Sequence, residues 1–176
     1  MRERTPTQLA LKWGAILGVL GMISTALNYV LEAYRDNTVA TIAFVVGLLV
    51  STIVYVLAMK AARTNNEGYL TFGQGFETGA LVSAISGLLV AAFNGVYLRF
   101  ISPETMQKLE QLQRQLALAR GMTAEQYEKN IASASGQLSS SVGFLFILKF
   151  FVLLVLGIII SLIVAAFLRK EKSIFE

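Results

Sequence analysis

Apolar residues along this chain are gathered into four long blocks, and nearly all charges lie between the blocks. The blocks cover residues 13–31, 38–59, 78–98 and 150–168. Each is close to the roughly 20 residues that a helix needs to cross the hydrocarbon core of a bilayer. Backbone polar groups must be satisfied within each segment in lipid, so the blocks are predicted to be helices. The pattern therefore predicts an all-α membrane protein with four transmembrane helices in a single membrane domain, residues 1–176.

Composition agrees with this pattern and removes several kinds of chemistry. Hydrophobic residues make up 55% of the 176 residues and charged residues only 15%, whereas soluble domains average about 25% charged residues. The chain has no cysteine and no histidine, which excludes disulfides, thiol catalysis and the usual zinc sites. We expect no metal, no cofactor and no catalytic residue.

The basic residues predict the orientation of the four spans. The N-terminal segment, the connection between spans two and three, and the C-terminal segment are rich in lysine and arginine, whereas the connection between spans one and two holds only Arg35. Such residues favour the cytoplasmic side. We therefore expect both termini in the cytoplasm of a bacterial inner membrane, with the long connection after span three outside. This topology explains the net charge of +4, so nucleic acid is not an expected partner.

The first block has an alternative interpretation as a cleaved signal peptide, because basic residues precede it. Its apolar stretch is longer than the 7–15 residues typical of a signal core, and no small-residue cleavage site follows it. The interpretation as a first span is therefore favoured.

Small residues recur at every fourth position in the third block, a pattern that lets a neighbouring helix approach closely. The predicted packing residues of this block and of the last block are Gly79, Ser83, Gly87, Ala91, Gly95, Gly157 and Ser161. A shorter row, Ala43, Gly47 and Ser51, occurs in the second block. We expect a compact bundle with the third span at its centre.

A few polar residues lie within the spans, and such residues usually face the interior of a bundle. The candidate polar cluster comprises Asn28, Ser83, Ser86, Asn94, Tyr97 and Lys149. Asn28 and Asn94 are predicted at nearly the same depth, and packing hydrogen bonds are the alternative to a functional site. Lys149 is expected at the outer boundary of the last span, with its ammonium group among the lipid headgroups.

Residues 103–138, between spans three and four, carry the pattern of an outer helical hairpin. Pro103 follows Ser102 at a predicted helix start, Gly121 follows the predicted helix end, and Thr123 with Gln126 has the spacing of a capping box. Acid-first pairs such as Glu104–Lys108 and Glu110–Arg114 suit a solvated helix face. Apolar stripes that could pack on each other, on the membrane surface or on a partner contain Met106, Leu109, Leu112, Leu116, Tyr127 and Ile131.

The connection before the third span is rich in glycine and aromatic residues: Thr71, Phe72, Gly73, Gly75 and Phe76. A phosphate-binding loop is one interpretation, but the spacing of known nucleotide motifs is absent. We instead expect Thr71 to cap the third helix, the phenylalanines to anchor its start among the headgroups, and the glycines to allow another backbone to come near. Asp36 or Asn37 is expected to cap the second span.

Several of these segments resemble a known family. They are Tyr-Leu-Thr-Phe-Gly-Gln-Gly-Phe before the third span, Val-Tyr-Leu-Arg-Phe-Ile-Ser-Pro-Glu at its end, and Gly-Met-Thr-Ala-Glu-Gln in the hairpin. Over residues 13–172 the chain resembles DUF4199, a family of uncharacterised bacterial integral membrane proteins. The resemblance implies four spans and no assigned activity.

Three functions follow as hypotheses. The first is a non-catalytic module that assembles with itself or with another envelope protein through the outer hairpin, within the lipid bilayer. The alternative is a subunit of an oligomeric small-molecule transporter, channel or sensor, which the polar cluster would serve. An enzyme is disfavoured because Glu77, the nearest candidate acid, lacks a second carboxylate at a suitable spacing.

Overall fold

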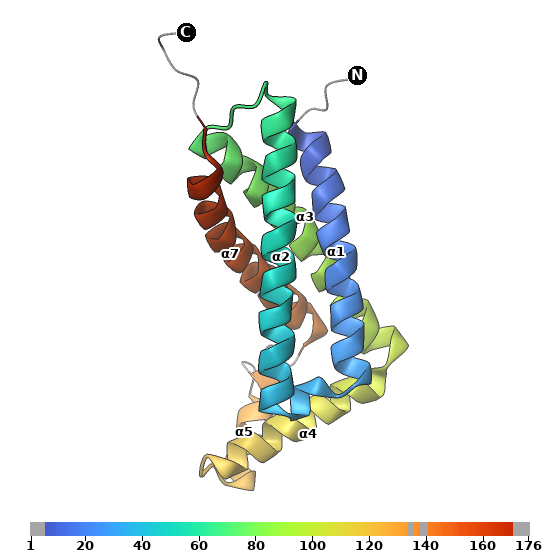
Figure 1. The fold of residues 1–176 in the computed structure, drawn as a ribbon. Coiled ribbons are helices and arrows are strands. Elements are labelled where there is room, and N and C mark those ends of the chain that lie inside the picture. Colours follow the sequence, from blue (N-terminus) through green and yellow to red (C-terminus); the bar gives the residue numbers. More distant parts are fainter. Residues whose placement is uncertain (1–5, 134–135, 138–140, 171–176) are drawn as a thin grey trace.

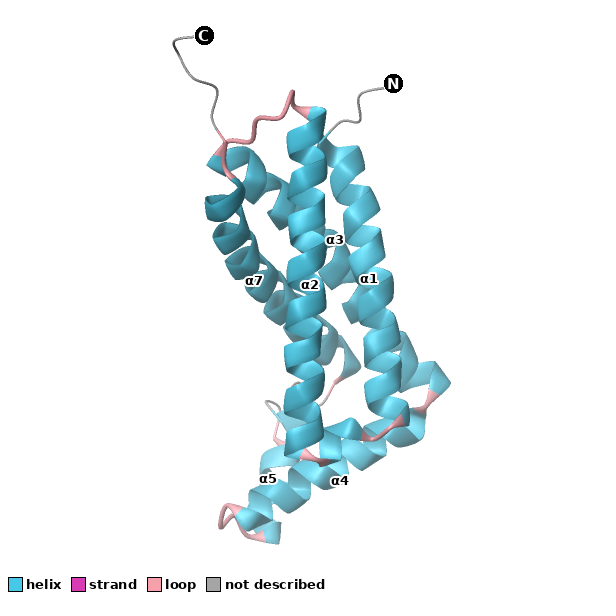
Figure 2. Ribbon diagram, viewed as in Figure 1, coloured by secondary structure: helices cyan, strands magenta, loops and turns pink. Residues whose placement is uncertain are grey.

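The computed structural model describes residues 6–133, 136–137 and 141–170, and this part of the chain is helical almost throughout (Figures 1 and 2). The elements are α1 (Pro6–Val30), the short 3-10 helix η1 (Ala33–Arg35), α2 (Asn37–Asn65), α3 (Phe72–Val96), the π-helix η2 (Tyr97–Ile101), α4 (Pro103–Ala119), α5 (Ala124–Ala132) and α7 (Val142–Leu168). Helices α1, α2, α3 (with η2) and α7 are long and apolar enough to span a membrane. The predicted fold class is therefore confirmed.

The long helices extend beyond the apolar blocks. Helix α1 begins at Pro6 and α7 at Val142, so both start well before the blocks that begin at Trp13 and Phe150. A charge such as Lys149 ends an apolar block, but it does not end a helix, because lysine is a good helix former. The hydropathy pattern therefore indicates where the four long helices lie but underestimates their length.

Side-chain caps fix several helix starts. The Asp36 carboxylate accepts hydrogen bonds from the backbone N–H groups of Thr38 and Val39, at 2.7 and 3.3 Å. Thr123 forms the predicted capping box with Gln126, and Thr71 forms another with Gln74. Ser102 precedes α4, but its hydroxyl pairs with the Thr105 hydroxyl at 2.8 Å and not with the helix backbone.

Helix α3 is the centre of the bundle and packs mainly on α1 and α7 (Figure 1). Half of its apolar window is buried, compared with 22–28% for the other three spans. The glycines of α1 bring the two backbones close, since a Cβ atom at Gly14 or Gly18 would crowd Ile85 or Leu89 of α3. Many large apolar side chains of α1, α2 and α7 are exposed, as expected for surfaces that face lipid.

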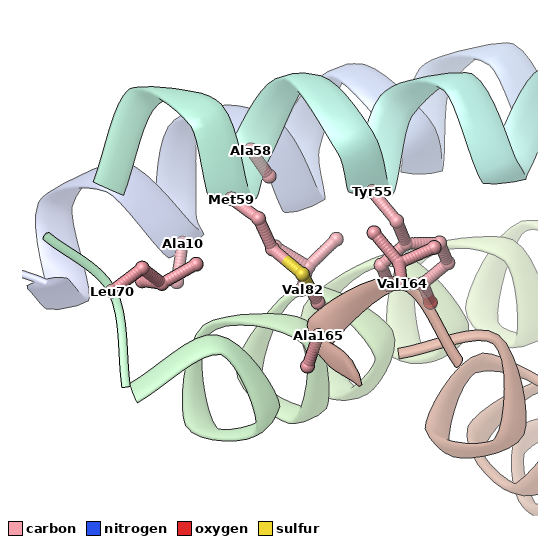
Figure 3. Packing of buried hydrophobic residues seen from close by; sticks show 8 residues of the cluster. All are labelled: Ala10, Tyr55, Ala58, Met59, Leu70, Val82, Val164 and Ala165. Atoms are coloured by element: carbon pink, nitrogen blue, oxygen red, sulfur yellow. The ribbon is translucent and has the colours of Figure 1, made fainter. Parts of the chain in front are cut away.

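A buried apolar cluster closes one end of the bundle (Figure 3). Met59 of α2, Val82 of α3 and Val164 of α7 meet there, together with Leu70 from the α2–α3 connection. The backbone of Leu70 exchanges two hydrogen bonds of 2.8 Å with Lys170, just after α7. The start of α1, the α2–α3 connection and the end of α7 therefore lie at the same end, opposite α4 (Figure 1).

A buried polar contact holds three helices together nearer the middle of the bundle. The hydroxyls of Tyr55 (α2) and Ser83 (α3) form a hydrogen bond of 2.7 Å. Gly157 of α7 lies against both, and a Cβ atom there would overlap both hydroxyls. Glycine is therefore required at position 157 for α7 to approach α2 and α3 this closely.

Candidate functional site

Helices α4 and α5 lie across the end of the bundle opposite the apolar cluster (Figure 1). The Lys108 ammonium group of α4 contacts the Glu32 carboxylate, which follows α1, at 2.5 Å. Arg114 of α4 pairs with Glu128 of α5 at 3.2 Å. Lys108 and Arg114 were predicted to pair with Glu104 and Glu110 of the same helix. Their observed partners instead connect α4 to the bundle and to α5. Residues 134–135 and 138, the end of the predicted hairpin, lie outside the described residues.

The contact between Glu32 and Lys108 depends on the charge of both groups. The hydrogen bond from Lys108, supported by the nearby Arg35, holds the pKa of Glu32 below its usual value. The same hydrogen bond raises the pKa of Lys108. The stabilisation from Glu32 is therefore complete above its unfolded pKa and is lost as the pH falls through the lowered value. The stabilisation from Lys108 is lost only as the pH rises above 10.5, the ordinary pKa of lysine.

We therefore expect the start of α4 to open in acid. Hydrogen exchange of the amides from Lys108 to Leu112, corrected for the intrinsic rate, should be slow at neutral pH and faster well below pH 4.5, the ordinary value for glutamate. A Glu32→Gln variant should exchange quickly at both pH values, because the amide carries no charge at either. Equal protection of the two proteins at neutral pH would contradict this role for the ion pair.

A cavity of about 510 Å³ lies between the bundle and this hairpin. Side chains from α1, η2, α3, α4, α5 and α7 line it, and its walls are mainly apolar. The lining residues are Tyr29, Asn94, Leu98, Met106, Leu109, Glu110, Gln113, Ile131, Phe144, Leu145, Leu148, Lys149 and Val152. The volume falls in the range of about 300–1,000 Å³ typical of ligand sites.

Asn94 and Tyr29 form the buried polar wall of this cavity. The Tyr29 hydroxyl donates a hydrogen bond of 2.6 Å to Asn94 Oδ1, and only 4% of Asn94 is exposed. The Tyr29 ring also packs against the ring of Tyr97, with centroids 5.1 Å apart. The chain thus orients the Asn94 amide through its carbonyl oxygen.

Lys149 lies about two turns into α7, on the wall of the cavity. It is partly buried, and among the described residues it makes neither a hydrogen bond nor an ion pair. Helix α7 begins at Val142, seven residues before Lys149, so the predicted position of Lys149 at the outer boundary of the last span does not coincide with the start of the helix. Glu110 also lines the cavity, from the exposed face of α4.

The remaining members of the candidate polar cluster do not gather in one place. Asn28 donates to the backbone carbonyl of Ser24 at 2.7 Å, so it is not the partner of Asn94. Ser86 donates to the carbonyl of Val82 in its own helix. Ser83 contacts Tyr55, away from the cavity lining. Of the six predicted residues, only Asn94 and Lys149 line the cavity.

The predicted packing residues of α3 and α7 are mostly buried, but they differ in how closely the next helix approaches. A Cβ atom at Gly79 would overlap the side chain of Ser161. At Gly87 and Gly95 it would make only ordinary contacts, at 3.6 and 3.7 Å. Ala91 is fully buried. Close approach is therefore concentrated at Gly79–Ser161 and at Gly157.

The predicted surface of the hairpin is divided. Met106, Leu109 and Ile131 line the cavity. Leu112 and Tyr127 are partly buried, whereas Leu116 is 46% exposed. The stripes therefore pack partly on the bundle and leave a smaller apolar surface around Leu116.

The segment at the start of α3 packs against the last turns of α7. Gly75 is buried and faces Ala165 of α7, and the carbonyl of Phe76 accepts a hydrogen bond from Ser161 at 3.4 Å. Nothing lies within 4 Å of a Cβ atom at Gly73, and Phe72 is exposed. Only one of the two glycines therefore allows another helix to come near.

Sequence reasoning missed two tyrosines, Tyr29 and Tyr55, that orient buried polar groups. Tyr29 suits the aromatic belt at the outer membrane surface, and Tyr55 lies within an apolar block, so neither position indicates a polar contact. The requirement that Asn94 and Ser83 find partners in hydrocarbon could have indicated them.

Comparison with known proteins gives one result. The family model described as "Protein of unknown function (DUF4199)" matches residues 12–170, nearly the whole chain. No curated protein and no solved structure shows a significant match.

Proposed function

The chain belongs to the DUF4199 family, whose members are described as proteins of unknown function. We propose that it is a non-catalytic interaction module of a bacterial inner membrane. Both termini would lie in the cytoplasm, and the α4–α5 hairpin would lie outside. The excess of lysine and arginine at the end with the termini supports this orientation. A partner would be a second copy or another envelope protein.

The observation that carries this proposal is the division of the hairpin surface. One part of the apolar stripe packs on the bundle, while Leu116 of the same stripe remains 46% exposed. Leu116 lies near the C-terminal end of α4, away from the contact between Lys108 and Glu32. An apolar surface on an otherwise charged helix indicates a contact surface for another protein.

Photo-crosslinking tests this proposal. A photoreactive amino acid at Ala119, which is exposed and lies on the same side of α4 as Leu116, should give defined crosslinked products in native membranes. Leu116→Glu should reduce their yield at least about tenfold, because a buried unpaired carboxylate strongly disfavours an apolar interface. The matched control Gln111→Glu adds the same charge at an exposed position that faces away from Leu116 and should leave the products unchanged. Equal yields from the wild-type protein and both variants would refute the proposal.

The cavity favours a second candidate function, a small-molecule subunit. Its polar wall and Lys149 provide the groups that transport or sensing would use. Four spans would have to assemble into an oligomer to enclose a pathway. Unchanged transport and growth phenotypes in an Asn94→Leu, Lys149→Leu double variant would count against it.

A further inference from the structure

The cavity under the hairpin combines long apolar walls with hydrogen-bond donors that the protein leaves unused. Leu98, Leu145, Leu148 and Val152 line it beside the Asn94 amide and the Lys149 ammonium group. A water-soluble metabolite would gain little from such walls. An amphiphile with an acyl chain would gain binding free energy with each methylene that it buries.

Asn94 is the first unused donor. Its carbonyl oxygen accepts the Tyr29 hydroxyl, and among the described residues its amide nitrogen has no hydrogen-bond partner. The residue is 4% exposed and lines the cavity. Its amide nitrogen is not one of the fully enclosed side-chain atoms that lack a partner, so a ligand oxygen in the cavity can accept its N–H groups.

Lys149 is the second unused donor, and it lines the same cavity. The part of the chain that the structure describes supplies no acidic partner for it, since neither Glu110 nor any other carboxylate lies within ion-pair distance. A lysine within a span normally pairs with an anion or lines a ligand pathway.

We propose that this cavity binds an amphiphile with an anionic headgroup, either a carboxylate or a phosphate. The headgroup would accept hydrogen bonds from Lys149 Nζ and Asn94 Nδ2, and the acyl chain would lie along Leu98, Leu145, Leu148 and Val152. Leu148 lines the cavity and is 49% exposed, so this wall of the cavity borders the outer surface of α7. Glu110, on the opposite wall, would favour a headgroup that also carries an ammonium group. This inference does not depend on the hairpin partner proposed above.

The test is a binding titration of the full chain in nanodiscs of neutral lipid. The probes are a fluorescent C16 fatty acid, lysophosphatidic acid, lysophosphatidylethanolamine and, as the uncharged control, monopalmitoylglycerol. We expect saturable binding of at least one anionic probe at least tenfold tighter than that of the uncharged probe. The probe that binds most tightly identifies the headgroup as carboxylate, phosphate or phosphate with amine.

Variants show whether the binding uses this cavity. Lys149→Gln and Asn94→Leu should each weaken the anionic probe about tenfold and leave the uncharged probe unchanged, whereas Lys149→Arg should retain binding. Lys60→Gln, which removes a cation at the other end of the bundle, is the matched control. If Lys149→Gln does not fold, Asn94→Leu and Lys149→Arg still provide the comparison. Absence of saturable binding, equal affinity for charged and uncharged probes, or no effect of the cavity variants would overturn the proposal.

Discussion

A Gly157→Leu variant is expected to lose the folded bundle. Even a single Cβ atom at this position would overlap the hydroxyls of Tyr55 and Ser83, and the larger side chain must push α7 away from α2 and α3. Overpacking of this kind costs about 3 kcal/mol or more at the upper end of its range, and it also breaks the 2.7 Å hydrogen bond between the two hydroxyls. Thermal unfolding of the purified protein in detergent would measure the loss.

The control for this prediction is Gly47→Leu, the same change in another apolar span. No atom lies within 4 Å of a Cβ atom at Gly47, so the added side chain points to open space on the surface of α2. Its stability should stay within about 0.5 kcal/mol of the wild-type protein. A Gly157→Leu protein as stable as the Gly47→Leu protein would show that α7 does not pack as described.

The second large effect is expected from Leu70→Ala. Leu70 is 1% exposed and closes the apolar cluster at the end of the bundle (Figure 3). Its removal leaves a cavity between Ala10 of α1 and the helices around Met59, and Leu→Ala changes of this type cost about 2–5 kcal/mol. The same thermal unfolding experiment would measure this loss of stability.

Phe72→Ala provides the comparison, because the sequence alone predicts that Phe72, together with Phe76, anchors the start of the third helix among the lipid headgroups. Phe72 is 40% exposed, so its truncation should cost less than that of Leu70, although the side chain is larger. If Phe72→Ala were the more destabilising change, the apolar cluster around Leu70 would not be what fixes this end of the bundle.

The spans and the helix caps are the features that sequence reasoning predicted well. A membrane imposes a length and a composition on every helix that crosses it, so four apolar blocks predict four long helices without knowledge of their contacts. The caps at Asp36 and Thr123 are local, since donor and acceptor lie within three residues of each other. Both signals are present in a short window of sequence.

Contacts between distant segments were much harder to predict. Lys108 was expected to pair with Glu104, four residues away, but it pairs with Glu32, which is 76 positions distant. Asn94 was matched with Asn28 by depth, whereas its partner is the adjacent Tyr29. A helical rotation of one residue, about 100°, decides which side chain faces the bundle, and hydropathy does not determine that rotation when the whole span is apolar.

The candidate site illustrates the same limit. Asn94, Lys149, Met106, Leu109 and Ile131 were each singled out from the sequence, but in two unrelated sets, one polar and one apolar. The cavity that brings them together depends on where α4 crosses the end of the bundle. That position depends on the π-helical residues 97–101 and on the Glu32–Lys108 pair, and neither feature has a sequence signal of its own.

The central claim is that the chain crosses the membrane four times, with the hairpin outside and both termini in the cytoplasm. Cysteine labelling tests this claim most directly. The natural sequence contains no cysteine, so single variants report one position each. Gln115→Cys in α4 should react with a membrane-impermeant maleimide in intact spheroplasts. Thr64→Cys, at the other end of the bundle, should react only after permeabilisation. Labelling of Thr64→Cys in intact spheroplasts, or protection of Gln115→Cys, would contradict the account.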